Sequence, residues 1–70
     1  MTLRSINKRL APHHVRLARG KGYFYFIYDH KDLFDTLSVY VASLSELPED
    51  EWVEDGIAFA KSVEGGADNG

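Results

Sequence analysis

Hydrophobic and polar positions change their period along the chain, and each period predicts an element. Near the amino terminus, Leu3, Ile6 and Leu10 recur at three- and four-residue steps, which lines one side of a helix. Pro12 ends this helix, because a proline pushes the residue before it toward extended backbone. The pattern therefore predicts a short helix over residues 2–10.

The next two hydrophobic runs alternate with the period of two that is typical of strands. Residues 15–19 and 23–28 are rich in β-branched and aromatic side chains, and the glycines between them permit a tight turn. If residues 20–21 form a two-residue loop, Leu17 lies opposite Phe24. The two runs therefore predict an antiparallel hairpin.

Alternation divides this hairpin into two faces. The face expected to meet the helices holds Val15, Leu17, Phe24, Phe26 and Tyr28. The other face is unusually aromatic for a surface in water, and it holds Arg16, Ala18, Tyr23, Tyr25 and Ile27. Two possibilities stay open for it. Either it is an exposed apolar patch of the kind that marks protein interfaces, extended by Tyr40, or residues 29–37 fold over it.

The segment after the hairpin predicts a loop followed by a third strand. Residues 29–36 mix charges with Leu33 and Phe34 without a clear period, so we expect a loop whose two apolar side chains tuck back. Residues 38–44 again hold the β-branched and aromatic side chains that favour a strand, and this strand is expected to pair antiparallel with residues 23–28.

An amphipathic helix is predicted from Pro48 onward. Proline suits the first helical position, and the acids at 49–51 complement the positive end of the helix dipole. The apolar side of this helix holds Trp52, Val53, Gly56, Ile57, Phe59, Ala60 and Val63. The polar side holds Asp50, Glu51, Glu54, Asp55 and Lys61. The order of elements predicts an α+β domain (αβββα) in which an N-terminal and a C-terminal helix pack on one face of a three-stranded antiparallel sheet.

The composition predicts one domain that folds without a disulfide or a bound metal ion. Residues 1–63 are expected to form it, and residues 64–70 (EGGADNG) are expected to be a disordered tail. The absence of cysteine excludes disulfides and thiolate metal sites and fits a cytoplasmic location. The sequence shows neither a secretory signal nor an apolar stretch of bilayer length, so we expect no membrane association.

Charge is polarised along the chain. The first 21 residues hold six of the eight Lys and Arg and no acid, while the other 49 hold all eleven Asp and Glu. The net charge of −3 therefore hides local charges of about +6 and about −9. The basic third either contacts a nucleic-acid backbone or pairs with the acidic part of the same chain.

The acidic side of the last helix places like charges four residues apart. Asp50 with Glu54, and Glu51 with Asp55, each cost about 0.2–0.5 kcal/mol, and the helix dipole offsets this only for the first turn. A solvated helix face explains the pattern without a function. The functional explanation is a negative ridge that imitates nucleic-acid phosphates or docks on a basic surface built to hold them.

The aromatic strand resembles the RNP1 strand of RNA-recognition motifs. The matching residues in KGYFYFIY are Lys21, Gly22, Tyr23, Tyr25 and Tyr28. The resemblance implies base stacking on Tyr23 and Tyr25, with Arg16 beside them. However, Phe24 stands where that family has a small residue, Phe26 stands at an aliphatic position, and the order of elements is not the βαββαβ of the family.

Residues for catalysis or metal binding are sparse. His13 and His14 are adjacent, which in a strand directs them to opposite faces, so we expect no shared metal ion. The serines lack a nucleophile elbow, and residues 20–22 are too few for a phosphate loop. The sequence therefore predicts a protein that is not an enzyme and holds no cofactor.

A second resemblance covers most of residues 20–60. The combination of GYFYF, SVYV and a Leu-Pro start to an acidic helix with Trp52 resembles short open reading frames of phages and prophages. Small acidic proteins of that kind are similar to anti-CRISPR inhibitors, several of which occlude a nucleic-acid-binding surface of a Cas complex. The resemblance implies an inhibitor in the host cytoplasm. It transfers no functional residues, because anti-CRISPR families share no common motif.

The leading hypothesis is therefore a phage-type inhibitor of a host CRISPR-Cas ribonucleoprotein. We expect the basic groove of the ribonucleoprotein to be contacted by Asp50, Glu51, Glu54 and Asp55 of this chain, with Arg16, Tyr23 and Tyr25 as a second contact. The alternatives are a single-stranded RNA or DNA binder that uses the tyrosine face, and a homodimer joined through the exposed sheet face. The expected oligomeric state is a monomer or a weak homodimer.

Overall fold

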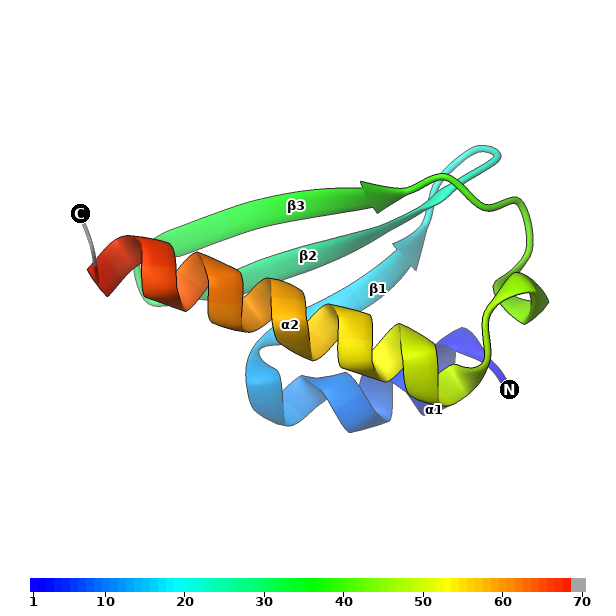
Figure 1. Ribbon diagram of the computed structural model, residues 1–70, viewed down its shortest axis with the longest axis horizontal. Helices are drawn as coiled ribbons and strands as arrows, with labels where there is room; N and C mark the ends of the chain where they lie inside the picture. The colour runs from blue at the N-terminus through cyan, green and yellow to red at the C-terminus, as the bar shows by residue number, and fades with distance from the viewer. Residues whose placement is uncertain (69–70) are drawn as a thin grey trace.

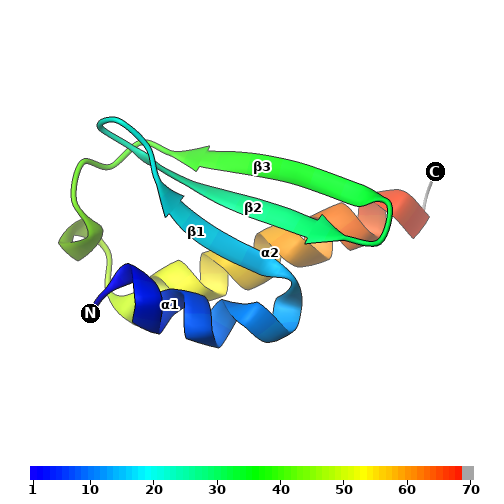
Figure 2. The same cartoon turned by 180° about the vertical axis from the view of Figure 1, so that it is seen from behind.

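The computed structural model describes residues 1–68 and has the predicted α+β architecture (Figure 1). Its helices and strands are α1 (Leu3–Leu10), β1 (Val15–Arg19), β2 (Phe24–His30), β3 (Leu33–Val39) and α2 (Glu49–Asp68). Single 3-10 turns lie at Ala11–His13 (η1) and Leu44–Glu46 (η2). The strands form an antiparallel sheet in the order β1-β2-β3, and both helices cover the same face of it (Figures 1 and 2). The predicted αβββα fold is confirmed.

Helix α1 begins at a reciprocal cap. The Thr2 hydroxyl accepts a hydrogen bond from the Ser5 N–H, and the Thr2 N–H donates to the Ser5 hydroxyl, each at 3.0 Å. The helix ends at Leu10, as Pro12 predicts, and η1 carries the chain into β1. Asn7 then ties α1 to that strand. Its side chain accepts from the Leu17 N–H at 2.6 Å and donates to the Leu17 carbonyl at 2.9 Å, which closes the outer edge of β1.

The β1–β2 hairpin is confirmed, but its predicted register is wrong. The loop has four residues instead of two, so Leu17 lies opposite Phe26 and Arg19 lies opposite Phe24. The positive φ of the turn falls at Gly22, and the Tyr23 ring lies over Gly20, where a Cβ atom would come within 2.6 Å of the ring. Because the shift is an even number of residues, it leaves every side chain on its predicted face.

The third strand lies earlier in the chain than predicted. Residues 29–36 do not form a loop, because β2 continues to His30, a turn at residues 31–32 follows, and β3 starts at Leu33. The predicted strand over residues 38–44 is wrong beyond Val39, since residues 40–43 connect β3 to η2. The sequence pattern fails here because β3 is an edge strand that is exposed over most of its length, so its alternation of polar and apolar residues is weak.

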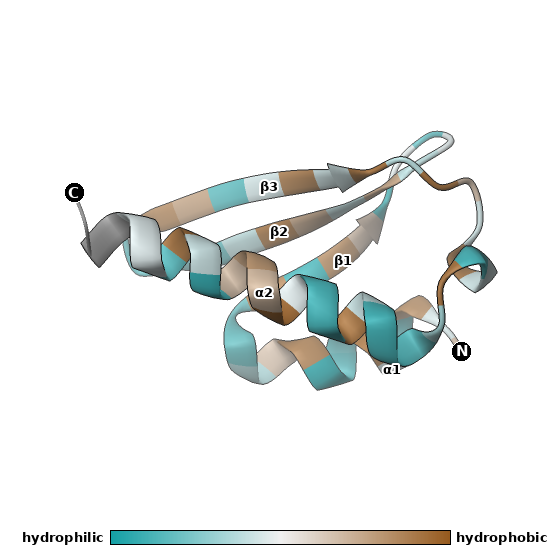
Figure 3. Ribbon diagram, in the orientation of Figure 1, coloured by the Kyte–Doolittle hydropathy of each residue, from teal (hydrophilic) through white to brown (hydrophobic). Residues whose placement is uncertain are grey.

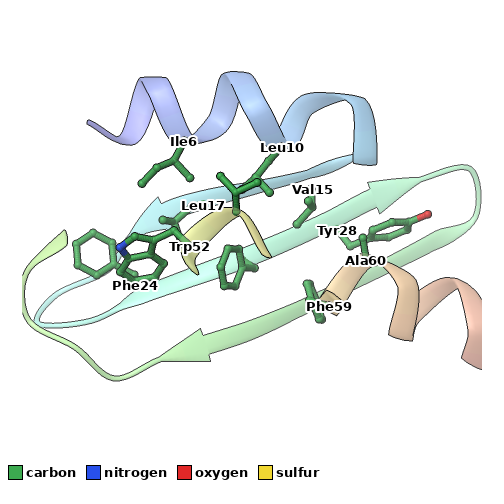
Figure 4. Close-up of a cluster of buried hydrophobic side chains, with 11 residues drawn as sticks. Ile6, Leu10, Val15, Leu17, Phe24, Tyr28, Trp52, Phe59 and Ala60 are labelled. Atoms are coloured by element: carbon green, nitrogen blue, oxygen red, sulfur yellow. The ribbon is translucent and has the colours of Figure 1, made fainter. Parts of the chain in front are cut away.

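The core lies between the inner face of the sheet and the two helices (Figure 4). Trp52 is fully buried at its centre, with its ring centroid 5.4 Å from that of Phe24 and 6.1 Å from that of Phe26. The Trp52 indole N–H donates to the Leu44 carbonyl at 2.8 Å, which holds η2 against α2. The buried set is Ile6, Leu10, Val15, Leu17, Phe24, Phe26, Tyr28, Trp52, Val53, Phe59 and Ala60.

Helix α2 extends beyond the predicted domain. The sequence predicts a disordered tail over residues 64–70, but residues 64–68 continue the helix, and residues 69–70 lie outside the described residues. Glu64 holds this end in place, because its Oε2 accepts a hydrogen bond from the buried Tyr28 hydroxyl at 2.7 Å. This bond raises the pKa of Tyr28 to about 12, with burial as the second cause. Within residues 1–68, no helix has the length and apolarity required to cross a bilayer.

Candidate functional site

The predicted acidic residues lie together on the exposed side of α2, with Asp55 at its border toward β3. Pro48 precedes the helix, and its carbonyl accepts the first backbone hydrogen bonds, from Glu51 and Trp52. Burial of Trp52 and Val53 then fixes the rotation of the helix about its axis. The resulting acidic ridge is exposed and consists of Asp50, Glu51, Glu54 and Asp55. Figure 3 shows the hydrophilic first turns of α2 facing the viewer.

Arg9, from the basic amino-terminal part of the chain, neutralises negative charge at one border of the acidic ridge. The Arg9 guanidinium contacts Asp50 Oδ1 at 2.8 Å and Glu49 Oε2 at 3.0 Å, which raises the pKa of Arg9. Glu49 also accepts a hydrogen bond from the Ser5 hydroxyl at 2.7 Å. That bond, followed by the one from Arg9, lowers the pKa of Glu49.

The other three carboxylates of the acidic ridge keep their charge uncompensated. Among residues 1–68, the ion pairs within 4.0 Å are those of Arg9, and none reaches Glu51, Glu54 or Asp55. These three residues lie within a little more than one turn of α2, so their repulsion is part of the folded state. A basic partner would relieve this repulsion.

The predicted tyrosine face is not covered by another element within residues 1–68, although Tyr23 and Tyr25 are themselves half-buried. Residues 29–37 do not fold over it, because β3 extends the sheet sideways, and both helices lie on the other face (Figure 2). The Tyr23 ring centroid lies 5.8 Å from that of Tyr25 and 6.0 Å from that of Tyr40, which is 84% exposed. Arg16 lies on the same face, opposite Ile27. The tyrosine face is the name used below for Arg16, Tyr23, Tyr25, Ile27 and Tyr40.

The acidic ridge and the tyrosine face lie on opposite sides of the molecule. The sheet separates them, since α2 covers its inner face while Tyr23, Tyr25 and Arg16 project from its outer face. The structure therefore brings together the members of each predicted surface but does not join the two surfaces into one. A partner that uses both would have to enclose the domain.

The basic residues of the amino-terminal third do not converge on the tyrosine face. Arg9 is held by α2, and the Arg19 guanidinium lies 5.0 Å from the centroid of the Phe24 ring, which faces inward. Arg16 is the cation that β1 directs to the outer face. The tyrosine face thus offers stacking surfaces with little of the positive charge that nucleic-acid backbones require.

The sequence did not predict that His14 and His30 would meet. Asp29 donates its N–H to the His14 carbonyl at 3.1 Å, which extends the β1–β2 ladder and stacks the two imidazoles at 3.6 Å and 8°. Rings stacked face to face direct their nitrogens away from a common point. Within the described part of the chain, no cluster of three or more His, Asp or Glu side chains is arranged to hold a metal ion.

Comparison with protein-family models, with curated proteins and with solved structures finds no match to this chain.

Proposed function

We propose that this protein is a non-enzymatic binding module whose acidic ridge docks on a basic surface of a partner protein. The uncompensated cluster of Glu51, Glu54 and Asp55 carries this proposal. The chain holds several cations near its amino terminus, yet the fold directs one of them to the border of the ridge and leaves the remaining carboxylates exposed. A patch of one sign is suited to a surface of the opposite sign.

The partner surface that fits best is one built to hold nucleic acid. Such surfaces carry closely spaced Arg and Lys that neutralise phosphates, and carboxylates on successive turns of a helix can replace those phosphates. The assignment of the partner as a host CRISPR-Cas complex, and of the protein as a phage-type inhibitor in the host cytoplasm, is supported by the sequence resemblance alone. A ridge on a rigid helix is compatible with that role.

The experiment measures binding to a panel of purified Cas effector complexes with their guide RNA. We expect one complex to bind, to lose affinity for its target nucleic acid, and to release the protein as salt rises from about 50 to about 300 mM. The double variant Glu51→Lys/Glu54→Lys should weaken binding by about tenfold or more. The matched control Asp29→Lys/Asp32→Lys makes the same change in net charge at the end of β2 and in the turn after it, and it should retain binding.

Two results decide the proposal. Undiminished binding by the Glu51→Lys/Glu54→Lys variant, with an intact far-ultraviolet circular dichroism spectrum, rejects the acidic ridge as the contact. Absence of binding to every complex in the panel rejects the CRISPR-Cas assignment.

The tyrosine face supports a second candidate function, binding of single-stranded RNA or DNA. The observation that favours it is the cluster of the half-buried Tyr23 and Tyr25 with the exposed Tyr40, because bases stack on such rings whatever their sequence. Titration with short oligonucleotides at low salt tests it. Binding that is lost in Tyr23→Ala/Tyr25→Ala supports this function, and no binding rejects it. Sedimentation at two protein concentrations tests the homodimer that the same face allows.

A further inference from the structure

We propose that the open edge of β3 and the groove beside it bind an extended, basic segment of another protein as a fourth strand. This docking site differs from the acidic ridge and from the tyrosine face, although Asp55 borders both the ridge and the groove. The proposal stands on three observations, which concern the backbone of the edge, the shape of the groove and its charge.

Along its outer edge, β3 has no neighbouring strand among residues 1–68, so backbone groups there lack interstrand hydrogen bonds. In the β1–β2 ladder, the bonds from Asp29 to His14 and from Gly20 to Tyr23 show that β2 directs the backbone groups of its odd-numbered residues to β1. The even-numbered residues of β2 therefore bond to the odd-numbered residues of β3. The even-numbered residues of β3 direct their backbone N–H and C=O groups away from β2, toward the open edge. These residues are Phe34, Thr36 and Ser38.

The two edges of the sheet differ in how they are protected. On β1, the Asn7 side chain occupies the outward backbone groups of Leu17, and α1 lies alongside. On β3, the corresponding protection found within residues 1–68 is a local bond, in which the Thr36 N–H donates to Asp35 Oδ1 at 2.8 Å. An incoming strand would supply a carbonyl to Thr36 and release the Asp35 carboxylate to pair with a cation.

A groove of about 520 Å³ lies between β3 and α2, along the same edge. Its apolar lining includes Leu37, Val39 and Phe59. Leu37 projects from the inner face, opposite the fully buried Phe26, yet it remains 45% exposed beside the α2 residues that line the groove. A fourth strand would place its inward side chains over this apolar floor, as α2 does over the neighbouring strands.

The charge of the groove identifies the occupant. Among the residues that line it, Asp35 and Asp55 are charged and none is a cation. A second copy of this chain, paired through β3, would bring the same carboxylates toward one another, which disfavours self-association. The complementary occupant is a segment in which apolar side chains alternate with Lys or Arg, so that the apolar ones cover Leu37 and the cations meet the two aspartates.

The test uses the full chain and three synthetic peptides of about ten residues. The first alternates Val or Leu with Lys or Arg. The second carries Glu in place of the cations. The third keeps the cations but has proline at alternate positions, which removes the N–H groups that a strand requires. Amide chemical shifts and hydrogen exchange locate the binding, and isothermal titration calorimetry measures it.

We expect the first peptide to bind saturably, to shift the amides of β3 and the Leu37 methyls, and to slow exchange at Thr36. The other two peptides should bind at least about tenfold more weakly. Leu37→Lys should abolish binding, while Ser38→Lys, which introduces the same charge on the opposite face of the same strand, should retain most of the affinity. Glu51→Lys/Glu54→Lys should retain binding, which separates this inference from the proposed function.

Four outcomes overturn the inference. The first is equal binding of the proline peptide, which would show simple charge attraction. The second is a shift pattern confined to α2 or to the tyrosine face. The third is no binding by any of the peptides. The fourth is a dimer mass in sedimentation together with slow exchange at Thr36 in the peptide-free chain, which would show that a second copy already occupies β3.

Discussion

Helix α2 approaches α1 and β2 closely at Gly56, which makes Gly56→Ala a direct test of the packing. Gly56 is buried in the middle of α2 and faces α1 and β2. A Cβ atom there would lie 2.7 Å from Leu10 Cδ2 and 3.0 Å from Phe26 Cε1, well inside ordinary contact distance. Neither neighbour can move into solvent, because both side chains are 0% exposed.

The expected effect is the balance of two terms. In a helix interior, alanine is favoured over glycine by about 0.5–1 kcal/mol. An extra methyl group in a filled core costs about 1–3 kcal/mol. We therefore expect Gly56→Ala to lower the free energy of unfolding by up to about 2.5 kcal/mol, which in a domain of this size lowers the melting temperature by up to roughly 20 °C.

Gly65→Ala is the matched control for this substitution. Gly65 lies in the same helix, and a Cβ atom there would meet nothing within 4 Å. The propensity term is therefore present without the steric term, and we expect Gly65→Ala to stabilise the protein by up to about 0.5–1 kcal/mol. Because the propensity term is common to both variants, the difference between them measures the cost of crowding Leu10 and Phe26.

Urea denaturation followed by tryptophan fluorescence measures both variants, since Trp52 is buried in the core beside Gly56. If Gly56→Ala stabilises the protein as much as Gly65→Ala does, then α1, α2 and β2 do not approach as closely as described. The account of the core that positions the acidic ridge would then be wrong.

Three further predictions concern single contacts. Asn7→Ala should lower the free energy of unfolding by about 1–3 kcal/mol, because it leaves the backbone N–H and C=O of Leu17 without their partner. Asn7→Asp should not restore stability, since a carboxylate cannot donate to the Leu17 carbonyl. Urea denaturation checks both variants. Because the folded-state pKa of Glu49 is lowered, its contribution to stability is present above about pH 4.5 and is lost as the pH falls through the folded value; Glu49→Gln should flatten the pH dependence of the melting temperature there. Because the pKa of Tyr28 is raised from 10.0 to about 12, its contribution is present below pH 10 and is lost as the pH rises toward 12, and Tyr28→Phe should remove that alkaline loss.

The order of elements and the faces of the hairpin could be predicted from the sequence because burial imposes a period on them. Phe24 and Phe26 alternate with Tyr23 and Tyr25 whichever loop joins the strands, so the wrong loop length changed the pairing without changing the faces. The exposure of the acidic ridge followed in the same way from the buried positions of α2.

The position of β3 could not be predicted because little of it is buried. Its inward positions include Asp35 as well as Leu37, and its outward positions include Phe34, which is 67% exposed. Such a strand is specified by its pairing with β2, a long-range interaction that leaves no local period in the sequence. The docking groove depends on this strand, so the sequence held no signal for it.

The charge separation along the chain has a limited effect on the fold, and this makes the acidic ridge testable. Of the amino-terminal cations, Arg9 forms the ion pairs found between the two ends among residues 1–68, and its side chain is 45% exposed, so water screens them. Changes at Glu51 and Glu54 therefore remove no intramolecular ion pair and should relieve repulsion within α2. We expect Glu51→Gln/Glu54→Gln to be at least as stable as the wild-type chain in urea denaturation. A clear loss of stability would show that these carboxylates serve the fold, and the argument that they are held for a partner would fail.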